Sequence, residues 1–597
     1  NYSFRYDTQD KVVRTAPAEY STEPGVVIPV TGDLFKNKLR QRSNSEYYHM
    51  VDAYLSYDNT FNDHHIRGVF GFNYEQDYQK NLYSTMMDIQ SNELNDFNLG
   101  NHTEGVSLEG GQYEWALESF FGRVGYDWKG RYLAEVNLRW DASSRFRRDK
   151  RAAVFPSVSA GWRVSEEPFF APIRNTFSNF KIRGSFGSLG NQAISSPYPY
   201  IQTLDLLQQN YLVNGEFLTY ASVSAPTAGN FTWETVVHGN LGLDLGFFNN
   251  RLTFAGDLYI RDTKDMLVPG KTLPGVYGAA SPKENAADLR TKGYELTLSW
   301  NDKFNLAGKP FTYGVSLALG DNISKITKYD NPTKDFNVSQ YYEGMTIGEI
   351  WGYKIDGLFQ TDEEAAAYAK AVDNSYVCEN IFVTAVGDYK GLQAGDPRYV
   401  DIDGSGRIDD GEKTADNRGD MVIIGNKEPR YLYNANIGLS WNGIDISAFF
   451  QGVGRQHRYP DGNNMMFWGG FARPYSSFVP ANFLDNVWSE ENPDAYLPKI
   501  RGYAAQGNRS LAHKNDRYLQ NIAYCRLKNL TVGYTLPTEW TSKIKLDRLR
   551  VYFSGDNLFT WTKLKSDYID PEQITVNSDA RTYPFSKVFS FGLDITF

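Results

Sequence analysis

The segment 401–412 has the residue types and the spacing of a calcium-binding loop. Loops of the EF-hand kind take oxygen ligands from alternate positions between the first and the ninth, and from a glutamate at the twelfth. The matching ligands are Asp401, Asp403, Ser405, the main-chain carbonyl of Arg407, Asp409 and Glu412, with Gly406 at the sharp turn. We therefore expect a divalent cation, Ca²⁺, in this segment. The alternative is a polar turn without metal, since Ser405 replaces the more usual carboxylate or amide and no flanking helices are evident.

Aromatic residues are concentrated in two long segments, 326–429 and 456–521. Sugar rings have apolar faces that stack on flat aromatic rings, and Tyr and Trp are also favoured in protein interfaces. The candidates for contact with a substrate or a partner protein are Tyr341, Tyr342, Phe467, Trp468, Phe471, Tyr475 and Trp488. The alternative is that these rings pack inside the segments that carry them.

No catalytic constellation stands out in the sequence. The seven histidines do not form the His-Glu-X-X-His spacing of zinc peptidases, and Ser188-Leu189-Gly190 is not a nucleophile elbow. Cys378 and Cys525 lie far apart, with neither a metal-ligand spacing nor a disulfide framework, and two free thiols are favoured over a disulfide. We therefore interpret the chain as a protein that is not an enzyme.

Composition and charge narrow the class of protein further. Aromatic residues make up 15% of the chain and there are 52 glycines, which is typical of β-structure with tight turns. The net charge of −10 argues against nucleic acid as a partner. There is no run of about 18 apolar residues that would form a transmembrane helix. The mean hydropathy of −0.50 is compatible with a membrane β-barrel, because only alternate residues of its strands face lipid.

Alternation of apolar and polar residues predicts long β-strands. In 131–141 the apolar residues fall on one face of a strand and the charged and amide residues on the other. The C-terminal residues 589–597 repeat the pattern with Phe, Leu and Ile. Strands of about ten residues suit a tilted crossing of a bilayer. The residues that we expect to face lipid are Tyr132, Val136, Leu138, Phe591, Leu593 and Ile595.

The connections between these strands alternate between short and mostly long. The predicted strands, about fifteen, are 46–57, 64–80, 113–127, 131–142, 154–165, 179–189, 232–246, 251–264, 288–301, 310–325, 430–441, 444–455, 522–536, 548–562 and 586–597. Short turns on one side and long loops on the other are typical of outer-membrane barrels, whose loops are extracellular. Bacterial single-chain barrels have even strand numbers, so at least one earlier strand is expected. The residues that follow Asn1 are interpreted as a polar loop.

A series of stretches spread over nearly the whole chain carries a family resemblance. They are GRVGYDWKGRYLAEVNLRWDASSRF (122–146), FPSVSAGWRVSEEPFF (155–170), FKIRGSFGSLGNQ (180–192), YIRDTKDML (259–267), NAADLRTKGYELTLSW (285–300), EGMTIGEIWGYKIDGLFQT (343–361), YCRLKNLTVGYTLP (524–537), RVYFSGDNLFTWTK (550–563) and DYIDPE (567–572). In this order they resemble the SusC/RagA family of TonB-dependent outer-membrane transporters.

The resemblance implies an all-β fold, a transmembrane antiparallel β-barrel of twenty-two strands. Residues 1–597 would supply about fifteen C-terminal strands, with 326–429 and 456–521 as long extracellular loops. Seven strands, the plug domain and the TonB box would lie upstream. The family often carries an acidic, glycine-rich stretch like 401–412, which need not bind metal. The chain end, with Gly592, Ile595 and Phe597, resembles the signal that barrel-assembly machinery recognises, and the same side chains would also form the last lipid-facing strand.

The function that the resemblance implies is active import across the outer membrane of a Gram-negative bacterium. The cargo would be an oligomeric nutrient, most often an oligosaccharide, and the energy would come through TonB. A SusD-like surface lipoprotein would cover the extracellular opening as a lid and contact the two long loops, and two such pairs could form a dimer. A peptide importer of the same family, a passive porin and a surface-binding barrel are the alternatives. A plug domain and a TonB box upstream would favour import.

Overall fold

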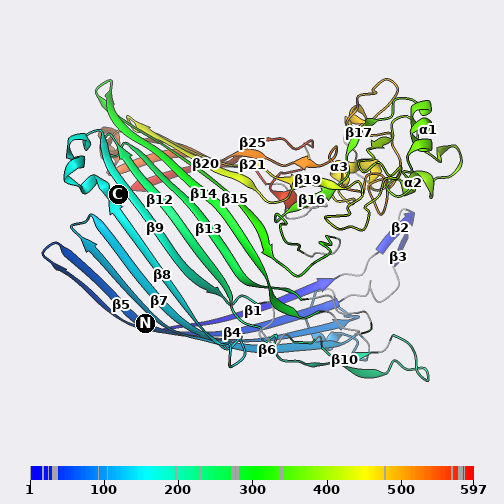
Figure 1. Ribbon diagram of the computed structural model, residues 1–597, viewed down its shortest axis with the longest axis horizontal. Helices are drawn as coiled ribbons and strands as arrows, with labels where there is room; N and C mark the ends of the chain where they lie inside the picture. The colour runs from blue at the N-terminus through cyan, green and yellow to red at the C-terminus, as the bar shows by residue number, and fades with distance from the viewer. Residues whose placement is uncertain are drawn as a thin grey trace. The chain divides into compact units, whose positions relative to one another are not determined.

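A computed structural model of the chain (Figure 1) describes residues 2–15, 19–23, 26–29, 38–91, 93–103, 105–194, 198–208, 210–224, 226–227, 231–270, 276, 281–336, 341–475, 479, 481–566, 569–575, 582–583 and 585–597. Its long strands belong to one sheet. They are β1 (Tyr2–Thr15), β4 (Lys38–Phe61), β5 (His64–Met87), β6 (Ser107–Trp128), β7 (Tyr132–Ser143), β8 (Ala152–Arg163), β9 (Phe177–Asn191), β12 (Glu234–Phe247), β13 (Leu252–Pro269), β14 (Lys283–Leu306), β15 (Lys309–Lys328), β20 (Arg430–Trp441), β21 (Ile444–Arg455), β24 (Tyr524–Thr535), β25 (Arg548–Thr562) and β26 (Val588–Thr596).

These 16 strands are hydrogen-bonded in chain order, with β1 and β26 at the two ends of that order. All the predicted strands are present, so the all-β expectation is confirmed. The polar loop expected after Asn1 is wrong, because β1 pairs with β4 from Tyr2↔Val51 to Thr15↔Lys38. Backbone pairing with β4 satisfies the main-chain groups along one edge of β1, although its second half lacks apolar alternation. The described chain therefore contains one strand of this sheet before the first predicted one.

The chain divides into two compact units. Unit 1 comprises Asn1–Ala160, Ser185–Val237 and Lys264–Ala286, and unit 2 comprises Gly161–Gly184, His238–Thr263 and Ala287–Phe597. Besides long strands, unit 1 contains two small hairpins. They are formed by β2 (Glu19–Glu23) with β3 (Val26–Pro29), and by β10 (Leu204–Gln208) with β11 (Thr219–Val223).

Tight turns join consecutive strands at one end, as the short connections predict. Asn442 and Gly443, between β20 and β21, have φ values of 47° and 85°. Ala307 and Gly308, between β14 and β15, have φ values of 51° and 77°. Two successive residues with positive φ fit the right-handed twist of paired strands and favour Asn and Gly. The local sequence therefore fixes these hairpins and, through them, the register.

In unit 2, the register places apolar residues opposite apolar residues on one face of the sheet. The pairs on this face include Val551↔Leu593, Phe553↔Phe591, Val532↔Phe553, Ile446↔Val532, Leu439↔Ile446 and Val315↔Ile437. The alternate positions on the other face include Asp445, Ser447, Thr531, Ser554 and Ser590. The apolar face is exposed, with Phe591 at 82% and Leu593 at 62%. This is the reverse of a soluble sheet, which covers its apolar face, and it suits contact with lipid.

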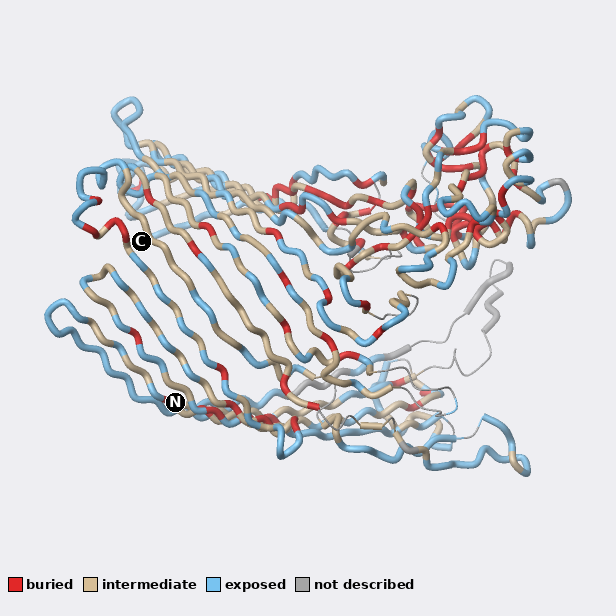
Figure 2. The backbone as a smooth tube through the Cα atoms, viewed as in Figure 1, coloured by how far each residue is buried: buried red, intermediate tan, exposed pale blue. Residues whose placement is uncertain are grey.

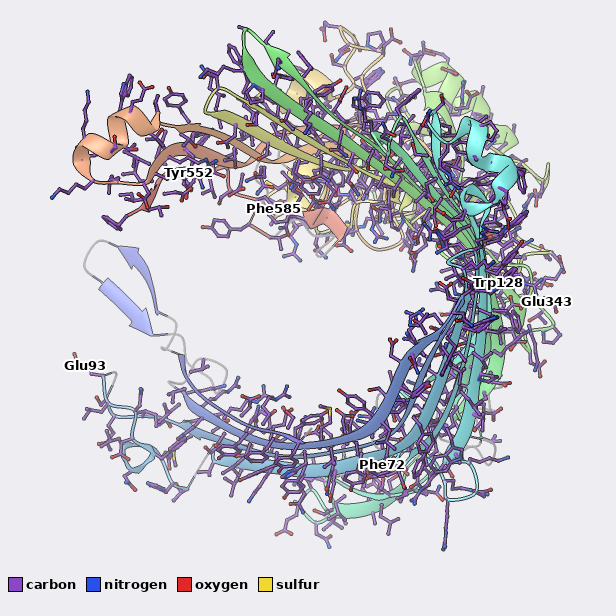
Figure 3. All side chains as sticks on the ribbon, turned by 90° about the vertical axis from the view of Figure 1, so that its left-hand side faces the viewer. Phe72, Glu93, Trp128, Glu343, Tyr552 and Phe585 are labelled. Atoms are coloured by element: carbon purple, nitrogen blue, oxygen red, sulfur yellow. The ribbon has the colours of Figure 1, made fainter. Side chains whose placement is uncertain are left out.

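Unit 1 has the same two faces. Tyr132, Val136 and Leu138 of β7 are exposed, whereas the polar residues between them are less exposed. Aromatic rings lie side by side on this apolar face, and two of them, Phe72 and Trp128, are labelled in Figure 3. The ring centroids are 5.1 Å apart for Phe72 and Phe120, and 5.6 Å apart for Trp128 and Tyr132. The side chains predicted to face lipid therefore share the exposed apolar face.

Buried residues of unit 2 gather mainly in the long connections rather than along the strands, as Figure 2 shows. The described residues of 341–426 and 457–522, called the loop domain below, contain three apolar clusters, around Trp468, Tyr399 and Trp488. The Trp468 cluster also includes Leu564, Ile569 and Ile574. The elements of the loop domain are β16 (Glu349–Gly352), β17 (Ile355–Leu358), α1 (Asp362–Ala371), α2 (Glu379–Phe382), β18 (Pro397–Tyr399), β19 (Val422–Asn426), β22 (His457–Arg458), α3 (Met465–Trp468) and β23 (Gln520–Asn521). Another short helix, α4 (Thr538–Thr541), precedes β25. Among the described residues, no helix has the length and apolar character needed to cross a membrane.

Candidate functional site

The polar face of unit 1 carries a row of polar residues across four strands. Asp52, Asn73, Ser119 and Asp141 stand opposite one another in the register of β4 to β7. The amide of Asn73 donates to Asp52 at 2.7 Å, and Arg139 donates to both Ser119 (2.8 Å) and Asp141 (2.7 Å). Because Asn73–Asp52 and Arg139–Ser119 hydrogen bonds join neighbouring strands, this face can remain polar beside a water-filled interior.

The polar face of unit 2 is organised by arginines that bridge strands. Arg183 of β9 donates to both carboxylate oxygens of Asp257 at 2.6 Å and to Asp244 at 3.2 Å. Asn240 also donates to Asp257, at 2.7 Å. The planar guanidinium matches two carboxylates at once, so one side chain holds β9, β12 and β13 in register.

A second arginine bridge lies near the C-terminus. Arg550 of β25 donates to Asp445 of β21 at 2.6 Å and to Asp594 of β26 at 3.0 Å. Between β14 and β24 the sheet also forms a shallow hollow of about 630 Å³, where Gly314 and Gly438 are opposite each other. No described atom lies within 4 Å of the place where a Cβ on Gly438 would stand. Small side chains therefore leave part of the sheet accessible to a solute.

Residues 569–572, the described part of the DYIDPE stretch, supply two carboxylates to the same unit, and residues 567–568 lie outside the described residues. Asp570 accepts a hydrogen bond from Arg526 of β24, and Glu572 accepts one from Lys528 at 2.9 Å. The ring of Phe585, labelled in Figure 3, covers the Arg526 guanidinium at 5.0 Å from its centroid. Arg526 is buried, so these contacts compensate for its lost hydration and hold this loop against β24.

The acidic segment 401–412 forms a compact turn. Asp401 accepts hydrogen bonds from the main-chain amides of Gly404 (2.8 Å) and Gly406 (2.9 Å), and Asp403 accepts one from Ser405 (2.9 Å). The positive φ of Gly406, 77°, is the sharp turn expected at that position. Asp420, which lies outside the motif, accepts amide hydrogen bonds from Ile402 (2.6 Å) and Asp409 (3.0 Å).

The carboxylates that the fold brings together differ from the predicted ligand set. Among the described residues, the group close enough to share one cation is Asp401, Asp403 and Asp420, with ligand atoms within 4.8 Å of one another. Asp409 and Glu412 are not in that group, and Asp409 lies 3.7 Å from the Arg407 guanidinium. The Ser405 hydroxyl instead donates to the Arg407 carbonyl at 3.0 Å. Burial raises the pKa of Asp420, which sequence spacing could not identify because it lies beyond the twelve-residue motif. Calcium binding stays a prediction.

Most of the aromatic residues expected at the surface are instead inside the loop domain. Tyr342, Phe467, Trp468, Phe471 and Trp488 are buried, and Trp468 is 0% exposed. The Trp468 ring lies 5.6 Å from that of Tyr518 and its indole N–H donates to the Pro460 carbonyl at 3.3 Å. All five side chains therefore pack inside the segments that carry them, which is the alternative given above. The expectation that Tyr342, Phe467, Trp468 and Phe471 are exposed for a partner is wrong, because these side chains are buried.

Two of the expected aromatics remain accessible. Tyr475 is 92% exposed, and Tyr341 is half-buried with its ring centroid 5.8 Å from that of Tyr329. Contact of either ring with a substrate or partner stays a prediction. At the C-terminus, Ile595 and Phe597 are exposed, and Gly592 lies opposite Tyr552 of β25, which Figure 3 labels. Their role in barrel assembly also stays a prediction.

The two longest connections are joined to each other through the loop domain. The Tyr399 hydroxyl donates to the Ser510 carbonyl at 2.7 Å, and the Tyr353 amide donates to the Lys514 carbonyl at 2.8 Å. Burial raises the pKa of Tyr399 far above its ordinary value, so this phenol remains a neutral donor. Both connections therefore lie at the same end of their strands, as predicted.

Comparison with known proteins decides the family. A family model described as "TonB dependent receptor-like, beta-barrel" matches residues 1–558. The chain belongs to this family. Its members are outer-membrane β-barrels that act as receptors and transporters and not as enzymes, in agreement with the predicted location and the absence of a catalytic motif.

The relatives of this family member include curated proteins from two bacteria. TonB-dependent receptor P3 of Formosa agariphila is 29% identical over 92% of the chain and 52% of the relative. TonB-dependent receptor SusC of Bacteroides thetaiotaomicron is 28% identical over 81% of the chain and 44% of the relative. The chain thus spans about half the length of these relatives. The resemblance to the SusC/RagA family is confirmed.

Solved structures support the barrel fold of the TonB-dependent receptor. A structure titled "Structure of the RagAB peptide transporter" matches with a TM-score of 0.73 and 21% identity, over 100% of the chain and 59% of the solved chain. At this identity the likeness shows the fold alone. The exposed apolar face and the opposite polar face described above fit the lipid-facing and lumenal sides of such a barrel wall.

Proposed function

We propose that this chain is the barrel wall and extracellular loop part of a TonB-dependent importer that takes up an oligomeric nutrient. The observation that carries the proposal is the two-faced sheet. One face is apolar and exposed. The other is polar, and ion pairs such as Arg183–Asp257 and Arg550–Asp445 join its strands. A wall of this kind separates lipid from a water-filled interior, which a soluble receptor does not need.

Energy and partner follow from the family rather than from residues of this chain. We propose that TonB supplies the energy through the part of the relatives that this chain does not cover. A SusD-like lipoprotein is proposed at the extracellular opening, and two such pairs are proposed to form a dimer. The loop domain supports this arrangement, since long connections with their own apolar core are usually functional.

Oligosaccharides are the proposed cargo, with peptides as the second candidate. The relationship to SusC motivates the first, and the likeness to the RagAB peptide transporter motivates the second. Polar side chains of the lumenal face, such as Asn73 and Asp52, can exchange hydrogen bonds with the hydroxyl groups of sugars or with peptide groups. These interactions do not by themselves discriminate between the two classes.

Uptake by the native strain tests the proposal directly. A strain lacking the gene is grown on a panel of single glycans and of peptide mixtures, beside the parent and a strain without TonB. Import predicts loss of growth on the same cargo in both mutants. Growth loss in the transporter mutant alone would indicate a passive pore, and normal growth of both on every cargo contradicts import.

A further inference from the structure

The hairpin β10–β11, in the connection between β9 and β12, is apolar and exposed on both faces. Leu204 and Leu206 lie on one face, and Leu207 and Tyr220 lie on the other. Large apolar side chains continue around the tip. Those that are between 43% and 76% exposed are Leu204, Leu206, Leu207, Tyr211, Leu212, Phe217, Leu218 and Tyr220. An apolar surface of this kind usually marks an interaction site.

The hairpin has a defined conformation and a fixed base. Asn214 and Gly215 have φ values of 54° and 85°, as a tight hairpin turn requires. At the base, the Thr203 amide donates to the Ser224 hydroxyl at 2.9 Å, and the Ser224 amide donates to the Thr203 carbonyl at 2.9 Å. The Tyr200 hydroxyl donates to the Ser144 carbonyl at 3.4 Å, within unit 1. The hairpin is therefore attached to unit 1 through its base, and its two faces stay exposed.

The strands of this hairpin have no third strand beside them in the part of the chain that the structure describes. An isolated two-stranded pair is only marginally stable in water. Its strand edges and its apolar faces are both available to another molecule. A molecule that binds over this surface would gain about 25 cal/mol of favourable free energy for each Å² of apolar surface that it removes from water.

The charges of the hairpin distinguish between the molecules that could bind to it. Between residues 198 and 224 the charged side chains are Asp205 and Glu216, and there is no Lys or Arg. Anionic lipid surfaces attract basic segments, so this acidic hairpin does not suit lipid headgroups. A second copy would bring only the same acidic groups. A protein with an apolar patch and basic residues at its rim is complementary.

We propose that the β10–β11 hairpin is the docking surface for the SusD-like lipoprotein. This inference rests on the proposed function and replaces the buried loop-domain aromatics as the contact expected with the lid. The connection that carries the hairpin is one of the long ones, which are extracellular in outer-membrane barrels, where a surface lipoprotein resides. The apolar side chains supply affinity, and Asp205 and Glu216 favour Lys or Arg on the partner.

Substitution on one face of the hairpin tests the proposal in the full-length transporter. Leu204→Ser with Leu206→Ser removes the exposed leucines of that face. The matched control is Gln208→Ser with Thr219→Ser, a register pair of the same hairpin that is already polar. Both transporters are isolated from outer membranes in mild detergent, and barrel assembly is checked by heat-modifiable mobility. Recovery of the lipoprotein is expected to fall by about tenfold or more with the leucine variant, and to be unchanged with the control.

A photo-crosslinker placed at position 206 identifies the cover without depending on a destabilising change. An adduct with the lipoprotein supports the inference. An adduct with lipid or with a second copy overturns it, as does equal recovery of the lipoprotein with the leucine variant and the wild type. If wild-type transporter yields no lipoprotein at all, the proposed partner itself is wrong and the inference falls with it.

Discussion

Arg501 forms a bidentate hydrogen-bonded ion pair with Asp396, and this pair joins the two longest connections of the chain. The guanidinium donates to one carboxylate oxygen at 2.7 Å and to the other at 2.6 Å. Asp396 is 1% exposed, and Arg501 also donates to the main-chain carbonyl of Tyr389 at 2.9 Å. A carboxylate this well buried has lost its hydration, so the arginine is what makes its burial tolerable.

Removal of Arg501 is predicted to open the loop domain. Arg501→Met leaves the Asp396 carboxylate buried without its counterion, and such a change costs roughly 3–5 kcal/mol. Hydrogen exchange of the loop domain in detergent is the measurement, and faster exchange in 389–396 and 499–505 is expected. Arg398→Met is the control. Arg398 pairs with Asp356, whose carboxylate is 74% exposed, and with Glu364, whose carboxylate is 35% exposed, and solvent-accessible pairs contribute about 1 kcal/mol or less. Equal effects of the two variants would contradict the importance of burial.

Acidification is predicted to destabilise the loop domain through His513. Its ring centroid lies 5.8 Å from that of Tyr353 and 5.6 Å from that of Tyr376, and burial lowers the pKa of His513 below its ordinary value. The charged groups that face it are Asp410 and Glu379, which favour protonation, and Lys413, which opposes it. The unfolded chain therefore takes up the proton more readily, and the free energy of unfolding falls as pH drops below about 6.5.

The measurement for this prediction is hydrogen exchange of the loop domain between about pH 7.5 and 5.5, corrected for intrinsic exchange. The pH dependence of protection is expected to be weaker in His513→Gln. His102→Gln, at an exposed position of unit 1, is the control and should behave like the wild type. An unchanged pH dependence in His513→Gln would mean that another group, such as His457, whose pKa is also lowered by burial, carries the effect.

The barrel wall could be predicted from the sequence because its signal is local. In each strand apolar and polar residues alternate with a period of two, and turns such as Asn442-Gly443 mark where strands end. The sequence does not predict β1, because only Tyr2, Phe4 and Tyr6 alternate with polar residues. The second half of β1 depends on backbone pairing with β4. The predicted strands are also too short, since β4 begins at Lys38 and β5 ends at Met87, and their pairing continues through polar pairs such as Asn44↔Asn81.

The loop domain could not be predicted in the same way, because its core comes from residues far apart in the chain. Trp468 is covered by Tyr459 and Tyr518, and Tyr399 packs against Tyr353. An aromatic residue in an irregular segment has the same sequence signature whether it is exposed or buried. The hairpin β10–β11 has a local signal, an Asn-Gly pair between apolar residues at 213–217, but its exposure depends on which described segments lie beside it, which the local sequence does not encode.

The lipid-facing parity of the strands gives a prediction for β26. Leu593→Arg places a charge on the apolar face, and near the midplane of the bilayer such a change costs about 2–4 kcal/mol. The control is Ser590→Arg, which has the opposite parity on the same strand and faces the polar side. Stability is measured by urea unfolding in lipid vesicles. A greater loss for Ser590→Arg than for Leu593→Arg would mean that the two faces have been exchanged.

Calcium binding to 401–412 gives the last prediction, in which the sequence motif and the structure make different claims. In an EF-hand loop the twelfth-position glutamate is an essential ligand, so Glu412→Gln should abolish binding. The structure instead groups Asp401 and Asp403 with the buried Asp420. On that basis Glu412→Gln has little effect, whereas Asp403→Asn removes a ligand from the group.

Isothermal titration of chelator-treated protein with Ca²⁺ separates these outcomes. We expect binding in the wild type and in Glu412→Gln, and weaker binding by about tenfold or more in Asp403→Asn, since site affinity depends on the number of charged ligands. Asp401 is less suitable for the test, because its carboxylate also accepts the amides of Gly404 and Gly406 and holds the turn without any metal. Absence of binding in the wild type at millimolar Ca²⁺ would show that the segment is a polar turn whose carboxylates serve its own backbone.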